Sequence, residues 1–234
     1  MSAVGAVGAV VMAAGAGRRM GYRPKSLLRR DGRPLIERVV RALLDKGVAP
    51  VMVVLGHHAA AIEPVLRGIQ GSLPDGRVLQ WVLNPAPDEG QGGSLRTGLA
   101  ALPPDLDAVL VALADQPLLE PADVAAVLSA WAEHAPGIDL LVPQFDGQPG
   151  HPIVFNQAVR AAVMQASGAV GVRQWRRAHP DRVQALLVQH ARHVVDVDAP
   201  EDLLAVARTY GVRLCWPDSD GREEVSRPPG RPGS

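Results

Sequence analysis

The hydrophobic residues of this chain switch repeatedly between a strand pattern and a helix pattern. Continuous apolar runs at 51–55 and 108–113 are typical of buried strands. Elsewhere apolar residues recur every three to four positions, as in the segment that starts at Pro34 and stops before Gly47, which predicts an amphipathic helix. Regular alternation of the two patterns predicts an α/β fold with a largely parallel sheet and helices on both faces.

The remaining elements follow from the same patterns. We expect further strands or extended segments at 10–14, 78–83, 139–142, 152–155, 183–188 and 194–197. We expect helices at 59–67, 94–102, 122–133, 156–165 and 170–178, and one that starts at Pro200. Residues 1–215 form one domain in this interpretation. The Pro-, Gly- and Arg-rich tail at 216–234 has no apolar periodicity and is predicted to be disordered.

The amino-acid composition and net charge exclude several classes of function. The 234 residues are 47% hydrophobic, which is enough for a sizeable core, and the formal net charge is zero. The absence of a basic face argues against a nucleic-acid polymer as partner. No apolar run has the length of a membrane span, and the single Cys215 excludes an internal disulfide framework. We therefore expect a cytoplasmic protein that does not bind membranes.

A glycine-rich, cationic loop follows the first apolar run. Gly15, Gly17 and Gly21 are interleaved with arginines, and the loop ends at Lys25, one of only two lysines among the 24 basic residues. Backbone N–H groups in such a loop close on anions, so the segment predicts a phosphate site. The spacing does not match a P-loop, and Met20 stands where a dinucleotide fingerprint requires its third glycine.

Acidic residues at strand ends are the main candidates for chemistry, because ligands of open α/β sheets bind beyond the carboxyl ends of the strands. Asp115 follows the apolar run 108–113 and Ala114. Asp196 and Asp198 alternate on the strand expected at 194–197 and would share one face. Asp198 could equally cap the helix that starts at Pro200. Carboxylates that converge on bound phosphates are typical of a Mg²⁺ site.

Two further segments are candidates for ligand binding. A second glycine-rich loop leads into the helix expected from Ser94, with Ser94 at the cap position and Gly93 before it. Gly150-His151-Pro152 opens an extended segment, where His151 is a weaker candidate. The other histidines lack convincing metal spacing and receive no role.

These motifs, in this order over about residues 5 to 210, resemble the nucleotidyltransferases of molybdenum-cofactor synthesis, the MobA-like NTP transferase family. The chain is most similar to the molybdenum cofactor cytidylyltransferase branch, because Ala14 replaces a glycine usual in the guanylyltransferases. The resemblance implies a Rossmann-like three-layer sandwich with a mostly parallel mixed sheet. It also implies transfer of CMP from CTP to a phosphorylated acceptor such as Mo-molybdopterin, with release of pyrophosphate.

The resemblance also implies roles for individual residues. Lys25, Arg19 and Asp115 would be catalytic, and Asp115 with Asp198, or else Asp196, would hold Mg²⁺. His151 would contact the acceptor. The nucleotide would bind Ala13, Ala14, Gly15, Gly17, Arg19, Lys25, Gly93 and Ser94.

Other functions stay open at this stage. The chain could be a cytidylyltransferase or guanylyltransferase for another small phosphate, such as a sugar phosphate. It could instead carry a finished cofactor to a molybdenum hydroxylase, although intact Lys25 and Asp115 argue against pure carriage.

Overall fold

The main sheet is mixed and mostly parallel. The structure, a computed structural model, describes residues 5–168 and 170–217. Its strands follow the order β10-β7-β9-β6-β1-β4-β5, and β8 pairs with β7 in a hairpin. Only β9 and β8 run antiparallel to their neighbours within this sheet. The strands are β1 (Val7–Ala13), β4 (Val51–Leu55), β5 (Leu79–Leu83), β6 (Ala108–Leu113), β7 (Leu140–Phe145), β8 (Gln148–Pro149), β9 (Ile153–Asn156) and β10 (Val183–Leu187).

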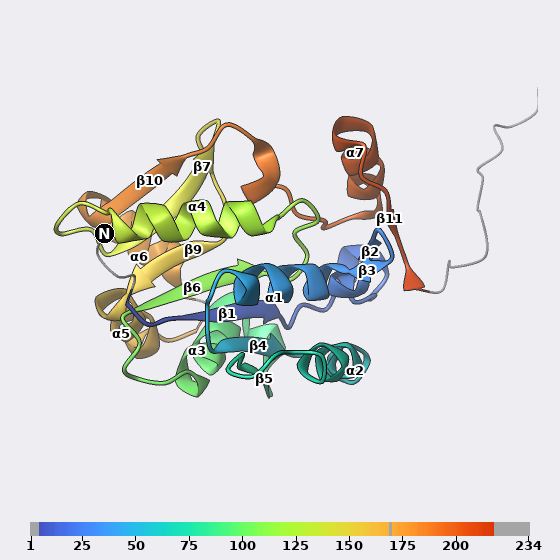
Figure 1. The fold of residues 1–234 in the computed structure, drawn as a ribbon, viewed down its shortest axis with the longest axis horizontal. Helices are drawn as coiled ribbons and strands as arrows, with labels where there is room; N and C mark the ends of the chain where they lie inside the picture. Colours follow the sequence, from blue (N-terminus) through green and yellow to red (C-terminus); the bar gives the residue numbers. More distant parts are fainter. Residues whose placement is uncertain (1–4, 169, 218–234) are drawn as a thin grey trace, which may run out of the picture.

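Helices cover both faces of this sheet, so the expected α/β three-layer architecture is confirmed (Figure 1). One core cluster joins the sheet to α1 (Leu35–Asp45), α2 (Ala59–Gln70) and α4 (Pro121–Ala132). The other joins it to α3 (Gln91–Ala101), α5 (Gln157–Gln165) and α6 (Val172–Ala178). Alternate residues of β1 enter the two clusters, as the period of a strand requires. Within the described residues, no helix is both long enough and apolar enough to cross a bilayer.

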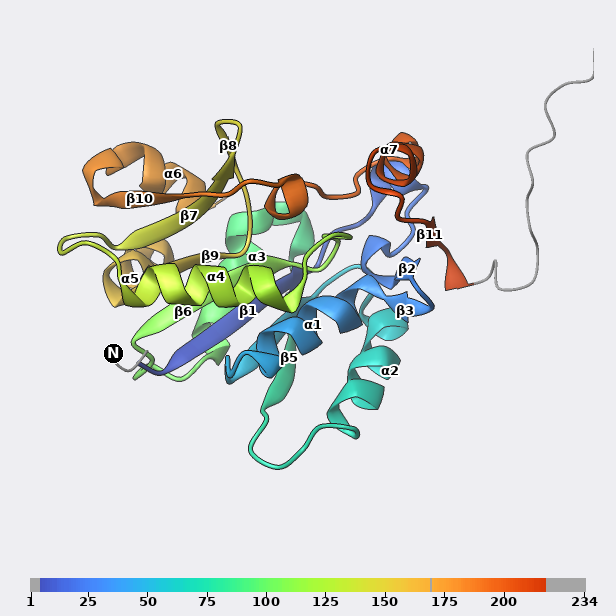
Figure 2. The same ribbon diagram turned by 45° about the horizontal axis from the view of Figure 1, so that its top comes forward.

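A smaller unit lies at one end of the main sheet. It consists of β2 (Arg29–Arg30), β3 (Arg33–Pro34) and β11 (Leu214–Cys215), with α7 (Pro200–Tyr210) beside them (Figure 2). Met20 from the first loop is buried here against Val197 and two leucines. This satellite core ties the C-terminal segment to the first glycine-rich loop, although the two are far apart in the sequence.

Two sequence expectations need correction. Residues 194–197 do not form a strand, because Val197 is buried in the satellite core and the segment has no partner in the sheet. Trp216, which we placed in the tail, packs on the folded part, with the Arg23 guanidinium 3.9 Å from its ring centroid. The rest of the predicted tail, 218–234, lies outside the described residues.

Candidate active site

The sheet brings the first loop and Asp115 to the same edge. β1 pairs in parallel with β6, Met12 lies opposite Leu113, and the Ala114 amide donates to the Met12 carbonyl at 3.1 Å. The chain continues from β1 to β4 on one side, whereas β6 lies on the other, so this is a topological switch point. Open α/β sheets bind ligands in the crevice that such a point creates.

The first loop has a fixed shape. Gly17 adopts the left-handed conformation at φ 62°, and a Cβ there would lie 2.1 Å from the Arg23 carbonyl oxygen. His58 Nε2 lies 3.0 Å from the Ala16 carbonyl oxygen, and buried Met20 anchors the far side of the loop. His58, which received no role from the sequence, therefore supports the loop. These contacts on both sides define the backbone conformation of the loop.

Gly17→Ala is expected to lower the free energy of unfolding by about 1–3 kcal/mol, because the new methyl group combines an unfavourable φ with a backbone clash. Thermal unfolding measures this loss. Gly15→Ala is the matched control, since a Cβ at Gly15 meets nothing within 4 Å. Equal destabilisation by the two variants would contradict the assigned loop geometry.

The Lys25 ammonium lies between two carboxylates. Its Nζ is 2.6 Å from Asp115 Oδ2 and 2.6 Å from Asp198 Oδ1. Arg19 reaches the other oxygen of Asp198, also at 2.6 Å. Lys25 exposes only 16% of its side chain and Asp115 19%. The structure thus brings together the four charged residues to which the family resemblance assigned catalysis and metal binding.

The electrostatics of the cluster follow from these contacts. Burial acts to lower the pKa of Lys25, but Asp115 and Asp198 outweigh it and raise that pKa above its ordinary value. The hydrogen bond from Lys25 lowers the pKa of Asp198, and Arg19 lowers it further. Burial raises the pKa of Asp196, as do the charges of Asp115 and Asp198. Negative charge is therefore concentrated at this edge of the sheet.

Tertiary contacts decide where Asp198 points. The Asp202 carboxylate accepts hydrogen bonds from the amides of Asp198 and Ala199, both at 2.7 Å, and so takes the capping role. The side chain of Asp198 is left for Lys25. Upstream, Gln116 donates to the carbonyl oxygens of His193 at 3.0 Å and His151 at 3.3 Å, which fixes the segment that leads to Asp198. Sequence analysis missed Gln116, although it directly follows Asp115.

The residues at this edge fit a divalent cation. Asp115 and Asp198 supply hard oxygen donors, and Mg²⁺ in proteins is held by one or two carboxylates together with phosphate oxygens. The Lys25 ammonium already bridges the two carboxylates, so this space accepts positive charge. Asp196 lies farther along the same wall and lines the adjoining cavity.

A separate cluster also has metal-ligand chemistry. Possible ligand atoms of Asp123, His190 and His193 lie within 4.8 Å of one another among the described residues. However, both Asp123 oxygens accept hydrogen bonds from Arg192, at 2.8 to 3.1 Å. An arginine thus fills the ligand position, and we interpret this cluster as a structural anchor of the 190–193 segment.

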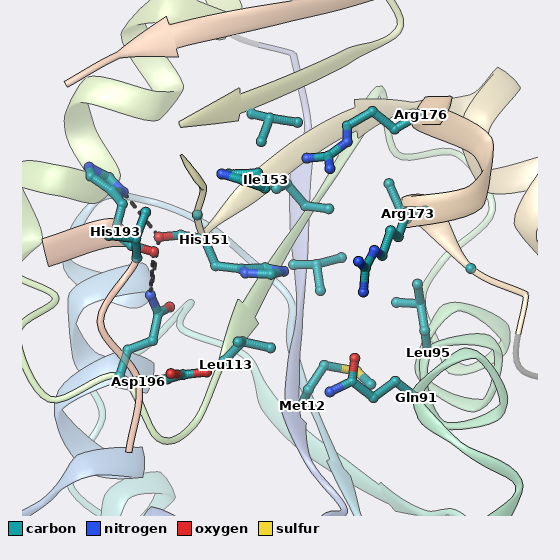
Figure 3. A pocket seen from close by; sticks show the side chains of 18 of the residues that line it. Met12, Gln91, Leu95, Leu113, His151, Ile153, Arg173, Arg176, His193 and Asp196 are labelled. Carbon is teal, nitrogen blue, oxygen red and sulfur yellow. Dashed lines mark hydrogen bonds between the residues drawn. The ribbon is translucent and has the colours of Figure 1, made fainter. Parts of the chain in front are cut away.

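A cavity of about 700 Å³ is lined on one side by Asp196, which interacts electrostatically with Lys25, Asp115 and Asp198 (Figure 3). Its floor is apolar and includes Met12, Leu95, Leu113 and Ile153, and its rim carries His151, Arg173, Arg176 and Asp196. Burial lowers the pKa of His151 to about 4, with a further contribution from Arg176, so the imidazole is neutral at neutral pH. The predicted acceptor residue His151 therefore lies in the cavity as an uncharged hydrogen-bonding group.

The second glycine-rich loop differs from the expectation. α3 begins at Gln91, so Ser94 lies inside the helix and not at its cap. Ser94 is buried, and its hydroxyl accepts a hydrogen bond from Asn84 Nδ2 at 2.9 Å. Gln91 and Gly92 line the cavity in its place. The helix starts early because Gly90, at φ 100°, makes the turn that precedes it.

Ala13 and Ala14 are both buried at the end of β1. The methyl group of Ala14 faces the backbone at Gly56, where an added Cβ would come within 2.9 Å of it. It belongs to the core cluster and is not part of the cavity lining. Any influence of Ala14 on the ligand must therefore pass through the backbone of the first loop.

Known proteins resemble this chain over most of its length. Residues 9–185 match the family described as the MobA-like NTP transferase domain. The nicotine blue oxidoreductase of Paenarthrobacter nicotinovorans is 33% identical over 201 residues, 83% of this chain and 93% of that protein. The bifunctional protein GlmU of Mycobacterium ulcerans is 31% identical over 172 residues, 71% of this chain but only 34% of GlmU. A solved nucleotidyl transferase from Methanothermobacter thermautotroptrophicus shares 26% identity at a TM-score of 0.67, with 86% of this chain and 95% of that chain covered.

Proposed function

Because the chain belongs to the MobA-like NTP transferase family, we propose that it transfers CMP from CTP to a phosphorylated acceptor, Mo-molybdopterin, and releases pyrophosphate. One observation carries the proposal. Lys25 lies between Asp115 and Asp198, beside a preformed glycine-rich loop and at the switch point of the sheet. This arrangement offers an anion cradle, a compact cation and two metal-ligating carboxylates within one crevice.

The chemistry requires positioning and charge stabilisation and no covalent enzyme intermediate. An acceptor phosphate oxygen attacks the α-phosphorus of CTP, and the bond from that phosphorus to the bridging oxygen breaks. Pyrophosphate leaves with the electron pair. Amides of the loop at Gly15 and Gly17, together with Arg19, hold the triphosphate. Lys25 exchanges its carboxylate partners for phosphate oxygens and stabilises the charge that develops there.

Asp115 and Asp198 would then hold a divalent cation, with Mg²⁺ proposed. When bound, this cation neutralises phosphate charge and favours the departure of pyrophosphate. The two carboxylates would hold it in a defined position, because Asp115 comes shortly after β6 and Asp202 caps the backbone at Asp198. The apolar cavity beside them accommodates the acceptor.

Pyrophosphate release tests the proposal. The protein is incubated with Mg²⁺ and each nucleoside triphosphate in turn, with Mo-molybdopterin or common sugar phosphates as acceptor. We expect turnover that requires both CTP and Mo-molybdopterin. A preference for GTP would contradict the cytidylyltransferase assignment. Turnover with a sugar phosphate but not with Mo-molybdopterin would contradict the proposed acceptor.

Ala14→Gly is expected to relax the preference for CTP over GTP without abolishing transfer. The lost methyl group frees the backbone at the start of the first loop. Because this methyl group does not line the cavity, we expect a change of at most about tenfold, the lower end of the range for a methyl group in direct contact with a ligand. The ratio of kcat/KM for CTP and GTP measures the effect in wild type and variant. An unchanged ratio would remove Ala14 from base selection and leave the reaction class untouched.

Reduction of a small molecule is a second candidate, favoured by the match across 93% of a protein named as an oxidoreductase. Against it, the first loop lacks the third glycine of a dinucleotide fingerprint, and β4 is followed by Gly56-His57-His58 with no carboxylate for a ribose. Oxidation of NADH or NADPH in the presence of a dye acceptor, followed by absorbance, tests this function directly. Nucleotide-dependent dye reduction without pyrophosphate release would favour the oxidoreductase.

A further inference from the structure

Two arginines of α6 face the cavity without a counter-charge. Arg173 and Arg176 line it, and Figure 3 shows both side chains directed toward its interior from the side opposite Asp196. Within the described part of the chain, neither forms an ion pair or a side-chain hydrogen bond. They are three residues apart on one helix, so their side chains lie next to each other.

Two other arginines, one buried and one half-buried, are compensated. Arg160 is buried, and its guanidinium donates to the carbonyl oxygens of Pro103, Leu99 and Leu102. Arg192 is bound by both oxygens of Asp123. For Arg176, by contrast, burial lowers the pKa, and the charges of Arg173 and Arg177 lower it further. Arg173 is exposed and Arg176 is half-buried. Two adjacent guanidinium groups repel each other unless an anion lies between them.

We propose that Arg173 and Arg176 form a second anion site in this cavity, so that the acceptor carries another negatively charged group besides the phosphate that receives the nucleotide. This inference rests on the proposed function, because it assumes that the cavity binds the acceptor. The apolar residues Met12, Leu113 and Ile153 lie between the arginines and Asp196 on the opposite side of the cavity (Figure 3). A suitable acceptor is therefore a doubly anionic molecule with an apolar or planar middle.

The arrangement selects between acceptor classes. A sugar monophosphate, neutral apart from its phosphate, would leave both guanidinium groups unpaired and would place hydroxyl groups against the apolar floor. A ring system with an anionic group at the far end would satisfy both surfaces. His151 also lines the cavity, and its neutral imidazole can form a hydrogen bond to the acceptor without adding positive charge to the site.

Matched probe compounds test the anion site. Straight-chain alkanediol bisphosphates of graded length, and the monophosphates of the same length, are titrated calorimetrically into the full-length protein saturated with a non-hydrolysable CTP analogue and Mg²⁺. We expect the best bisphosphate to bind about ten- to a hundredfold more tightly than its monophosphate, as a charge-assisted contact predicts. This ratio should fall to near one in the double variant Arg173→Gln, Arg176→Gln.

Arg177→Gln is the matched control, because Arg177 lies on the same helix but does not line the cavity. It should keep the wild-type ratio, and thermal unfolding of each variant checks that the fold is retained. An unchanged ratio in the double variant overturns the proposal. So does a parallel loss of affinity for the CTP analogue, which would assign the arginines to the triphosphate.

Failure of the proposed function is recognised separately. Calorimetry with the same probes is repeated on the nucleotide-free protein and does not depend on turnover. The preference for the bisphosphate over its monophosphate should be present in wild type and lost only in the double variant. This result supports the anion site even if the wild-type protein releases no pyrophosphate. A normal release of pyrophosphate with an unchanged ratio overturns the anion site alone.

Discussion

Lys25→Ala is expected to lower kcat/KM for nucleotidyl transfer by about a hundred- to a thousandfold, the usual effect of removing one group that stabilises transition-state charge. Lys25 contacts both carboxylates, with Nζ 2.6 Å from each. Its replacement leaves the negative charges of Asp115 and Asp198 facing each other. The measurement is steady-state pyrophosphate release under saturating Mg²⁺.

The structure changes one part of this expectation. A side chain in a glycine-rich loop is usually exposed, and its removal then has little effect on folding, but the Lys25 side chain is mostly buried and paired. A decrease in stability of about 1 kcal/mol is therefore expected as well. Added Mg²⁺ should restore much of it, because the variant offers two uncompensated carboxylates. Lys25→Arg is the control: it keeps the charge, should retain stability, and should still lose activity because a planar guanidinium does not replace a compact ammonium.

Wild-type kcat/KM in Lys25→Ala would remove this residue from the reaction. Equal activity of Lys25→Arg and wild type would show that charge alone matters. Calorimetric titration with Mg²⁺ in the absence of nucleotide gives an independent result, since the variant should bind the cation more tightly than wild type does.

Asp115→Asn is expected to raise the Mg²⁺ concentration for half-maximal activity at least about tenfold and to lower kcat, because the amide keeps the shape of the side chain and loses its charge. Its melting temperature should change far less. Asp88→Asn is the matched control, because Asp88 likewise pairs with a basic side chain, that of Arg18, but both side chains are exposed. That variant should keep the wild-type Mg²⁺ dependence.

Manganese binding followed by electron paramagnetic resonance measures the same site without turnover. We expect weaker binding in Asp115→Asn and in Asp198→Asn, with Asp196→Asn closer to wild type, because Lys25 bridges Asp115 to Asp198 and not to Asp196. The reverse order for Asp196 and Asp198 would show that Asp196 is the second ligand. Unchanged binding in all three variants would assign Asp115 a structural role at the end of β6.

Most of the architecture of this protein can be predicted from local patterns in the amino-acid sequence. The strands at Val51–Leu55 and Ala108–Leu113 have the bounds that the apolar runs predict, and α1 begins and ends within a residue or two of the proline and glycine signals. These features are local, because backbone hydrogen bonding and burial of an apolar run depend on neighbouring residues. The first loop and Asp115 were found for the same reason, since each directly follows a recognisable strand.

Which side chains contact one another, by contrast, depends on how the elements pack together. Lys25 and Asp198 are 173 positions apart, and their contact depends on the satellite core, the Asp202 cap and the Gln116 hydrogen bonds. The same long-range contacts turned the predicted strand at 194–197 into an irregular segment. The sequence pattern predicts the wrong position for Ser94 because the turn at Gly90 starts α3 early. It does not identify the arginines of α6 as functional residues, because a basic residue on a short helix usually faces water. Spacing along the chain determines each element, whereas packing between elements determines the direction of each functional side chain.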